Sequence, residues 1–97
     1  MSVDVILNLQ VNTENREELL AVFEAILPDT RAYQGCQSVV VTSNEDDIHN
    51  IVLLEKWDNR SDHESYMGWR TERGEIDKLV SLLSAPPAVS YLATIPA

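Results

Sequence analysis

Apolar and polar residues alternate along the first part of the chain. The odd positions of residues 3–11 are all apolar: Val3, Val5, Leu7, Leu9 and Val11. The even positions are mixed, and Asn8 interrupts them near the centre. Because successive side chains of a strand point to opposite faces, this pattern predicts a β-strand with one buried face and one mixed face.

A helical repeat follows this strand. Asn15 and Glu18 have the spacing of a capping box, which predicts that a helix starts there. Pro28 has no amide hydrogen, so we expect the helix to break at that residue and to continue for about one more turn, to Tyr33. Apolar residues then recur at intervals of three or four on the predicted buried stripe: Leu19, Phe23, Ile26 and Leu27.

The middle of the chain predicts a β-hairpin. Residues 36–43 are centred on three consecutive valines, and residues 48–57 contain the aliphatic run 51–54. The polar residues 44–47 form a short connection between them, which is typical of antiparallel neighbours. Gly35 precedes the hairpin and is placed to take the left-handed conformation that ends many helices.

Helical spacing returns after the hairpin. Ser61 and Glu64 form a second capping-box pattern, which predicts a helix over residues 61–70. Gly74 separates this helix from a further amphipathic segment, whose apolar residues are Ile76, Leu79, Val80 and Leu83. A pair of prolines ends that segment, and residues 88–95 form the last predicted strand.

The predicted order is β-α-β-β-α-β, which is the ferredoxin-like plan of an antiparallel sheet with helices on one face. A chain of 97 residues is long enough for one small domain and one core. We therefore expect residues 1–97 to form a single α+β domain.

The predicted central strands are apolar on both faces. Val52 and Leu54 face away from Ile51 and Leu53, and Val40 faces away from the valines beside it. The helices can cover only one face, and leaving several aliphatic side chains in water would forgo several kcal/mol at roughly 25 cal/mol per Å². We therefore expect a second copy of the chain to cover the other face in a symmetric homodimer.

Charge and cysteine content narrow the possible partners. The formal net charge of −9 argues against binding to a nucleic-acid backbone or to an anionic membrane surface. No segment approaches the ~20 apolar residues of a membrane span, and the start of the sequence does not resemble a signal peptide. Cys36 is the single cysteine. We therefore expect a cytoplasmic protein with neither a nucleic-acid nor a membrane partner.

Four segments of the sequence resemble a known family. They are residues 31–41 (RAYQGCQSVVV), 53–57 (LLEKW), 64–74 (ESYMGWRTERG) and 86–92 (PPAVSYL). In these segments the chain resembles the antibiotic biosynthesis monooxygenase domain, which has a dimeric α+β barrel fold and whose relatives include quinol monooxygenases and heme-degrading enzymes. The resemblance covers nearly the whole chain.

The resemblance implies a cofactor-independent monooxygenase that oxidises a small aromatic or quinol-like substrate with dioxygen. In such a reaction the protein stabilises the substrate anion, orients its ring and excludes water. Asn8 and Arg70 would stabilise the oxyanion, and either His63 or Tyr66 would handle the proton. The aromatic walls of the pocket would be Phe23, Trp57 and Trp69.

Helical spacing places part of this set together, although each residue also has a simpler interpretation. His63, Tyr66 and Arg70 lie at i, i+3 and i+7 of the predicted helix and share one stripe, which Trp69 borders. The simpler interpretations are a core or interface tryptophan, a solvated histidine, a structural tyrosine and a surface ion pair. Asn8 faces either the polar side of an interface or the pocket.

Two departures from the family keep other functions open. Many members carry a histidine near the position of Tyr66 or Met67, and those that hydroxylate polycyclic phenols have an asparagine where Leu53 stands. These differences favour, as an alternative, a non-catalytic small-molecule-binding or stress-response dimer. Heme binding or degradation is a third possibility, although the expected axial histidine is missing. His49 and His63 have neither a cysteine pair nor an HExxH motif, so we expect no metal site and no cofactor.

Overall fold

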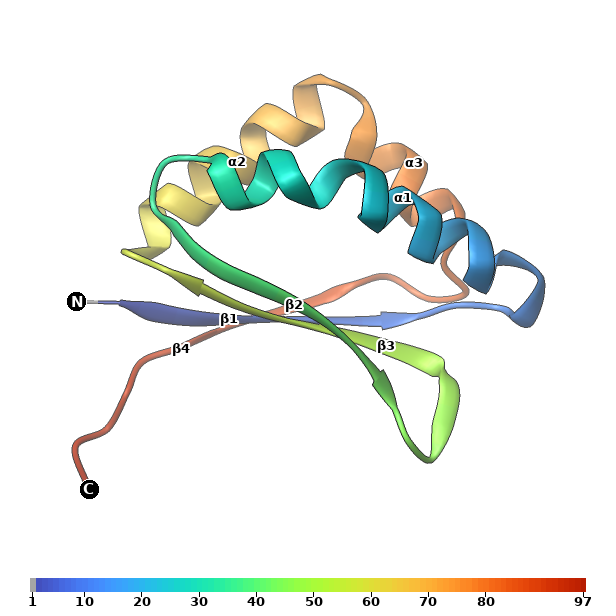
Figure 1. Ribbon diagram of the computed structural model, residues 1–97, viewed down its shortest axis with the longest axis horizontal. Coiled ribbons are helices and arrows are strands. Elements are labelled where there is room, and N and C mark those ends of the chain that lie inside the picture. The colour runs from blue at the N-terminus through green and yellow to red at the C-terminus, as the bar shows by residue number, and fades with distance from the viewer. Residues whose placement is uncertain (1) are drawn as a thin grey trace.

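A ferredoxin-like α+β fold is present in the computed structural model, which describes residues 2–97 (Figure 1). The elements along the chain are β1 (Val3–Gln10), α1 (Thr13–Ala32), β2 (Cys36–Asn44), β3 (Asp47–Trp57), α2 (Arg60–Glu72), α3 (Glu75–Ser81) and β4 (Ala88–Leu92). The strands form one antiparallel sheet in the order β2-β3-β1-β4. The predicted fold class is therefore confirmed, with the second helical connection divided into α2 and α3.

The pairing of β1 with β3 decides which side chains reach the core. Three antiparallel pairs share one face of the sheet: Val5 with Glu55, Leu7 with Leu53, and Leu9 with Ile51. Trp57 lies on the same face of β3 and is fully buried. The carboxylate of Glu55 therefore lies within an otherwise apolar surface.

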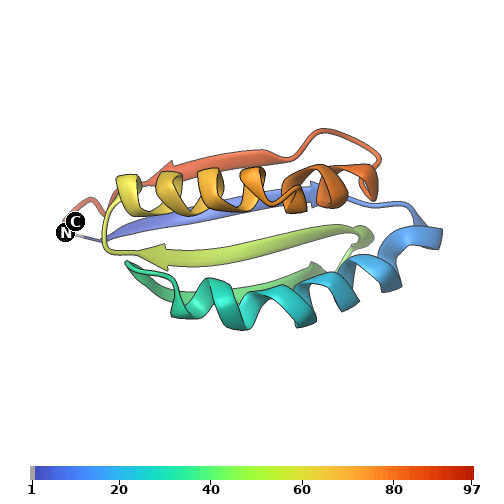
Figure 2. The same ribbon diagram turned by 90° about the horizontal axis from the view of Figure 1, so that it is seen from above.

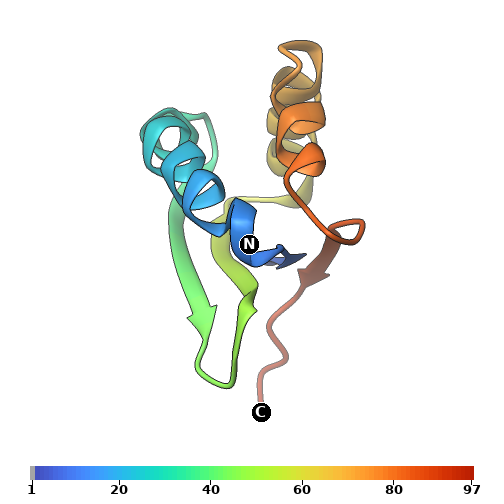
Figure 3. The same ribbon diagram turned by 90° about the vertical axis from the view of Figure 1, so that its right-hand side faces the viewer.

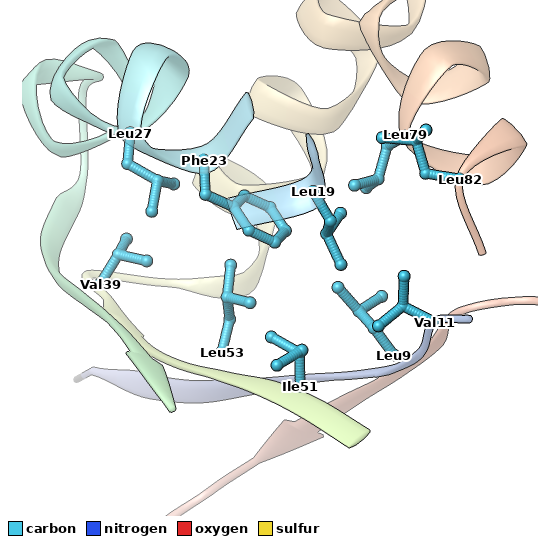
Figure 4. Packing of buried hydrophobic residues seen from close by; sticks show 10 residues of the cluster. All are labelled: Leu9, Val11, Leu19, Phe23, Leu27, Val39, Ile51, Leu53, Leu79 and Leu82. Carbon is cyan, nitrogen blue, oxygen red and sulfur yellow. The ribbon is translucent and has the colours of Figure 1, made fainter. Parts of the chain in front are cut away.

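The helices α1, α2 and α3 all cover this face. Seen from above, α1 runs over β2 whereas α2 and α3 run over β1 (Figure 2), and the end view places all of them on one side of the sheet (Figure 3). The main core fills the space between the layers, where side chains from the helices and the strands point toward one another (Figure 4): Leu9, Val11, Leu19, Phe23, Leu27, Val39, Ile51, Leu53, Leu79 and Leu82.

Both predicted capping boxes are wrong. The first helix begins after Asn12, and Asn15 lies inside its first turn, where the side-chain amide donates to a carbonyl just after α3. The second helix begins after Asn59, whose side-chain oxygen accepts a hydrogen bond from the amide of Asp62 at 2.9 Å. An asparagine just upstream of Ser61 thus takes the capping position, because asparagine and serine are both favoured there and spacing alone does not choose between them.

The predicted break at Pro28 is also wrong, because α1 continues through the proline to its end. Pro28 removes one hydrogen bond from the helix, but tertiary contacts hold the turns around it. The guanidinium of Arg70 donates to the carbonyl of Ile26 at 2.8 Å and to the hydroxyl of the buried Thr30 at 3.1 Å. Packing against α2 therefore outweighs the local effect of the proline.

Two glycines end helices as predicted. Gly35 has φ 89° and Gly74 has φ 78°, values that glycine adopts without strain. The carbonyl of Gly35 accepts a hydrogen bond from the amide of Asp58 at 2.7 Å, and a Cβ at Gly35 would collide with the carboxylate of Asp62. This turn therefore brings the end of α1 into direct contact with the beginning of α2.

Strand ends differ from the prediction at two places. β1 ends at Gln10, and Val11 instead forms an isolated bridge with Leu83. The last strand ends at Leu92 rather than at residue 95, and the chain beyond it runs away from the sheet (Figure 1). The predicted hairpin between β2 and β3 is confirmed.

The second face of the sheet carries apolar side chains that no element within residues 2–97 covers. Val40, Leu54 and Leu92 are 52%, 44% and 47% exposed on this open face, beside the partly buried Ile6 and Val52. The predicted two-sided apolar sheet is therefore confirmed. Among the described helices, none combines the length and the apolar character that crossing a membrane requires.

Candidate active site

A cavity of about 70 Å³ lies between the sheet and the helices. Most of its wall is apolar and comes from β1, β3, α1, α2, α3 and the start of β4: Val5, Leu7, Phe23, Ile26, Leu27, Leu53, Met67, Ile76, Leu79, Pro87 and Val89. The polar side chains on the wall are Thr30, Glu55, His63, Tyr66, Arg70 and Glu75. A mostly apolar hollow with a few convergent polar groups is the usual form of a small-molecule site.

Glu55 places a carboxyl group in this apolar wall. The alternation of β3 turns its side chain toward the helices, and it is only 5% exposed. The indole Nε1–H of Trp57 donates to its Oε1 at 2.9 Å. Burial raises the pKa of Glu55, and the hydrogen bond from Trp57 offsets part of this effect. The carboxyl group therefore holds its proton to a higher pH than an exposed glutamate does.

His63 faces this carboxyl group from the first turn of α2. Its Nε2 lies 3.8 Å from Oε1 of Glu55, and its Nδ1 lies 2.7 Å from the hydroxyl of Tyr91. Its ring packs edge-on against the rings of Trp57 and Tyr91, with both centroids 5.3 Å away. Burial lowers the pKa of His63, and the charge of Glu64 opposes this effect.

The pKa values of Glu55 and His63 thus shift toward each other. A strong ion pair would move them the opposite way, since each charge would favour the other. Burial therefore outweighs the attraction across 3.8 Å. Shifts in these directions bring the proton affinities of the two groups closer together, which favours proton transfer between them and suits general acid–base chemistry.

Arg70 forms the centre of a second polar cluster on the wall of the cavity. Its Nε donates to the hydroxyl of Tyr66 at 3.0 Å, one terminal nitrogen donates to both carboxylate oxygens of Glu75 at 3.0 Å, and the other donates to α1. The hydroxyls of Tyr66 and Thr30 lie 2.6 Å apart. Arg70 is 1% exposed, and every nitrogen of its guanidinium has a protein acceptor.

Glu75 balances the charge of this cluster. Burial alone would raise the pKa of Glu75, but hydrogen bonds from Arg73 and Arg70 outweigh it and hold the pKa below its usual range. The three helices meet at this point, since Arg70 belongs to α2, Glu75 to α3 and the acceptor Thr30 to α1. The cluster therefore holds together the three helices that cover the cavity. It leaves Arg70 with no free N–H donor.

Comparison with known proteins relates this geometry to a family. The family described as antibiotic biosynthesis monooxygenase matches residues 2–70, which is more than half of the chain. The chain belongs to the antibiotic biosynthesis monooxygenase family. The solved structure of Rv0793 from Mycobacterium tuberculosis is similar over 100% of this chain and 98% of that one, with 27% sequence identity and a TM-score of 0.87.

More distant structures share the fold. A conserved protein from Methanosarcina mazei Go1 has 15% identity and a TM-score of 0.86, over 94% of this chain and 90% of that one. A crystal structure of an antibiotic biosynthesis monooxygenase also has 15% identity and a TM-score of 0.86, over 97% of this chain and 99% of that one. Among curated proteins, none matches the sequence. The predicted family resemblance is confirmed, and identities of this size show the fold alone.

The segment that matches the antibiotic biosynthesis monooxygenase family carries much of the cavity wall. Residues 2–70 include Glu55, His63 and Tyr66, and the match ends at Arg70. Glu75 and Tyr91, which bond to these residues, lie beyond the match. These outer contacts of the site therefore lie outside the segment that matches the family.

The structure brings together four of the seven residues that the sequence analysis assigned to the site. His63, Tyr66 and Arg70 lie on one buried face of α2, as their spacing predicted, and Phe23 joins them from α1 on the cavity wall. Trp57 stands behind this wall, fully buried, and bonds to Glu55.

The remaining two residues lie elsewhere. Trp69 is partly buried beside the polar cluster, with its ring 5.4 Å from that of Tyr33 and with the guanidinium of Arg70 4.6 Å from its centroid. Asn8 is exposed on the open face of the sheet, where its side-chain oxygen accepts from Asn50 at 2.7 Å. Asn8 occupies an even-numbered position in β1, which faces away from the helices. Neither Asn8 nor Trp69 lines the cavity.

Four residues of the site were not predicted from the sequence: Thr30, Glu55, Glu75 and Tyr91. Glu55 could have been found, because the alternation Ile51, Leu53, Glu55, Trp57 places one charged residue on a buried face. The contacts of Thr30 and Tyr91 depend on helix packing and on strand register, which the local pattern does not contain. Within residues 2–97, no group of three or more His, Cys, Asp or Glu side chains gathers closely enough to hold a metal ion.

Proposed function

We propose that the protein is a homodimeric, cofactor-independent monooxygenase that oxidises a small phenol or quinol-like substrate with dioxygen. The observation that supports this most is the buried pair of Glu55 and His63 on the wall of an apolar cavity. Such a pair can remove a phenolic proton where water is scarce, which is the first requirement of the reaction. Membership of the antibiotic biosynthesis monooxygenase family supports the reaction class.

The reaction balances without an external reductant. A phenol with a free carbon opposite its hydroxyl loses the hydroxyl proton to Glu55, and the resulting anion passes one electron to dioxygen. The two radicals then join to form a carbon–oxygen bond, which gives a hydroperoxide after protonation. Loss of the proton on that carbon breaks the O–O bond and releases one water. The products are a quinone and water, and the substrate supplies all four electrons.

The polar groups of the cavity would share the work of this reaction. Glu55 would act as the base, and His63 would exchange protons with it. Tyr66 would donate its hydroxyl hydrogen to the substrate oxygen, and the bond from Arg70 would make that hydroxyl a stronger donor. Arg70 itself has no free N–H, so its contribution would pass through Tyr66.

The size of the cavity limits the substrate. A cavity of about 150 Å³ is known to hold benzene, whereas this one measures about 70 Å³. A single aromatic ring would therefore require side chains such as Met67 and Ile76, which are partly exposed, to move aside. We propose a substrate of one or two rings that enters by displacing these flexible wall residues.

The open face of the sheet supports a homodimer. Val40, Leu54 and Leu92 would leave water if a second sheet packed against them, at roughly 25 cal/mol per Å² of apolar surface. Asn8 lies on this face and would then contact the partner rather than the substrate. The single cysteine supports a cytoplasmic location.

Oxygen consumption tests the proposed reaction. Purified protein, free of metal and flavin, is mixed with a panel of one-ring and two-ring phenols and hydroquinones in an oxygen electrode, and the product is analysed after reaction with ¹⁸O₂. We expect uptake above the uncatalysed rate and, for phenols with a free carbon opposite the hydroxyl, one labelled oxygen in the product. Uptake equal to the buffer rate for every substrate in the panel would contradict the proposal.

One observation favours a second candidate, a binding protein without turnover. Every nitrogen of Arg70 is bonded within the protein, so this cation on the cavity wall has no free N–H for a substrate anion. Calorimetric titration of the same panel distinguishes the two candidates. Saturable binding without oxygen uptake would favour the binding protein, and hemin can be included to test heme binding by its Soret band.

A further inference from the structure

We infer that Tyr91 connects the buried pair of Glu55 and His63 to solvent as a proton relay. This inference concerns the same site as the proposed function and rests on it for its biological meaning, but its geometry and its test are independent of turnover. Tyr91 lies in β4 and the histidine in α2, so the relay joins two elements that are distant in sequence.

The relay has three members in a line. The side chains of Glu55 and His63 are 5% and 4% exposed, so neither exchanges protons with bulk water directly. Both line the cavity, whereas Tyr91 does not, which places the histidine ring between the cavity and the tyrosine. Tyr91 is only partly buried, and the exposed Arg60 lies over its ring at 4.1 Å. The hydroxyl of Tyr91 is therefore the polar group that leads from His63 toward the surface.

Within residues 2–97, the side chain of Glu55 is hydrogen-bonded only to Trp57 and that of His63 only to Tyr91. Trp57 covers one side of both residues through its ring contact with His63 and its bond to Glu55. Tyr66 lies 6.1 Å from the histidine ring and its hydroxyl is bonded on the far side, to Thr30 and Arg70. An apolar substrate in the cavity would exclude water from the remaining side.

The proton transfer balances at each atom. In the starting state the Nδ1–H of His63 donates to the oxygen of Tyr91, and the lone pair of Nε2 faces Glu55. Protonated Glu55 rotates across the present 3.8 Å gap and gives its proton to Nε2. Nδ1 passes its proton to the oxygen of Tyr91, which releases its own hydroxyl hydrogen to water. The histidine ends as the other neutral tautomer, and the 2.7 Å contact with Tyr91 serves both tautomers.

The charged groups around the relay fit this direction of transfer. Glu64 lies near the histidine from its own helix, and Arg60 lies over the ring of Tyr91. Burial, and then the charge of Glu64, raise the pKa of Tyr91, and the charge of Arg60 opposes this effect. The hydroxyl of Tyr91 therefore stays neutral and releases a proton only as it receives one from His63. The relay thus allows the buried base to lose its proton even when the cavity is filled, and the reverse transfer restores the first tautomer of His63.

Proton exchange measured by nuclear magnetic resonance tests the inference. The chain has two histidines, and His49→Gln leaves the signal of His63 alone. The exchange rate of its ring N–H with water is measured in this background with and without Tyr91→Phe, with no substrate present. We expect the exchange to slow by about tenfold or more, in keeping with the contribution of a positioned proton-transfer group. An unchanged or faster rate would overturn the inference.

A matched control removes a different hydroxyl from the same aromatic cluster. Tyr33→Phe leaves the contacts of His63 intact, because the hydroxyl of Tyr33 lies 3.4 Å from that of Ser65 instead, and we expect no change in exchange. If Tyr91→Phe does not fold, 3-fluorotyrosine at position 91 keeps the packing and makes the hydroxyl more acidic. Faster exchange would then support the relay, and an unchanged rate would overturn it. An absence of oxygen uptake would contradict the proposed reaction alone.

Discussion

At the scale of single residues, Glu55 is the feature that the fold alone does not explain. A carboxyl group at the centre of a buried apolar strand face destabilises the folded protein when it ionises, and a leucine there would pack at no such cost. One hydrogen bond from Trp57 compensates only part of this. Residues that break a local rule in this way are often functional, which is why we place the chemistry at Glu55.

Replacing Glu55 by glutamine tests whether this carboxyl group serves the reaction at a cost in stability. Glutamine keeps the acceptor for Trp57 but cannot act as a base, so kcat/KM for the best substrate should fall by about 10²–10⁴-fold. Because the folded-state pKa of Glu55 lies above its ordinary value of 4.5, the stability linked to its proton is present below that value and is lost as the pH rises through the folded-state pKa. The variant should therefore be more stable than the wild type at pH 8 and similar at pH 4.

Thermal unfolding at both pH values and oxygen uptake are the two measurements. The control is Glu24→Gln at an exposed position of α1, which should change neither the thermal stability nor the oxygen uptake. A Glu55→Gln variant that is fully active, or less stable than the wild type at pH 8, would contradict the assignment of a buried base.

Trp57→Phe should alter the pH dependence of activity. The indole hydrogen bond lowers the pKa of Glu55, so its removal should raise that pKa further and move the acidic limb of the kcat/KM profile to higher pH. The smaller ring should also cost about 1–3 kcal/mol of stability. Trp69→Phe, outside the cavity, should leave the profile in place. An acidic limb that stays fixed in Trp57→Phe would mean that this bond does not tune the base.

The sequence predicted those site residues whose positions follow from one element. His63, Tyr66 and Arg70 share a helix face because helical spacing is local, and that prediction is confirmed. The partner of Arg70 was not predictable, since Glu75 reaches it only after Gly74 turns the chain into α3. The contact between His63 and Tyr91 likewise depends on the pairing of β4 with β1, which no local pattern specifies.

At the scale of elements, the helices are joined by buried polar contacts as much as by apolar packing. Arg70 reaches the Ile26 carbonyl of α1 and the Glu75 carboxylate of α3 from its own helix α2. This connection explains why α1 continues through Pro28 although local rules predict a break. Helix propensity favours certain start and end positions, but in α1 the tertiary contacts of Arg70 outweigh the propensity of Pro28.

Glu75→Gln tests this connection. It leaves the buried Arg70 with a neutral partner, which should cost about 1–2 kcal/mol at pH 7, below the range for fully buried pairs because Glu75 is 23% exposed. The folded-state pKa of Glu75 is depressed, so its contribution is present above its unfolded pKa and is lost as the pH falls through the folded-state value. The difference between variant and wild type should therefore vanish in strong acid.

Urea unfolding from pH 7 down to pH 2 measures this effect. Glu72→Gln, an exposed residue of α2, is the matched control and should lie within about 0.5 kcal/mol of the wild type throughout. A deficit in Glu75→Gln that persists unchanged at pH 2 would show that the lost stability comes from packing rather than from charge.

At the scale of the whole molecule, one face of the sheet is covered and the other is open. The proposed partner for the open face is a second copy, because the exposed apolar residues Val40, Leu54 and Leu92 of this face come from β2, β3 and β4. The net charge of −9 on each chain opposes this association. Pairing should therefore become tighter as salt screens the repulsion.

Leu54→Lys should separate the proposed dimer. It places a charge at the centre of the open face, and burying that charge without a partner should weaken association by about 100-fold or more, or about 2.8 kcal/mol. Val80→Lys is the control, because Val80 is similarly exposed at 41% but lies on α3. Sedimentation equilibrium at micromolar concentration measures both. A monomeric wild type, or a Leu54→Lys variant that still pairs like the wild type, would contradict the dimer.

The turn at Gly35 has a consequence for the width of the cavity, although it lies outside its wall. The end of α1 and the start of α2 touch at this residue, and any side chain there would press on Asp62. Both helices line the cavity, through Phe23 and Thr30 of α1 and Tyr66 and Arg70 of α2. A residue with no side chain thus sets the separation of the walls, so substrate size is governed partly from a position that no substrate would reach.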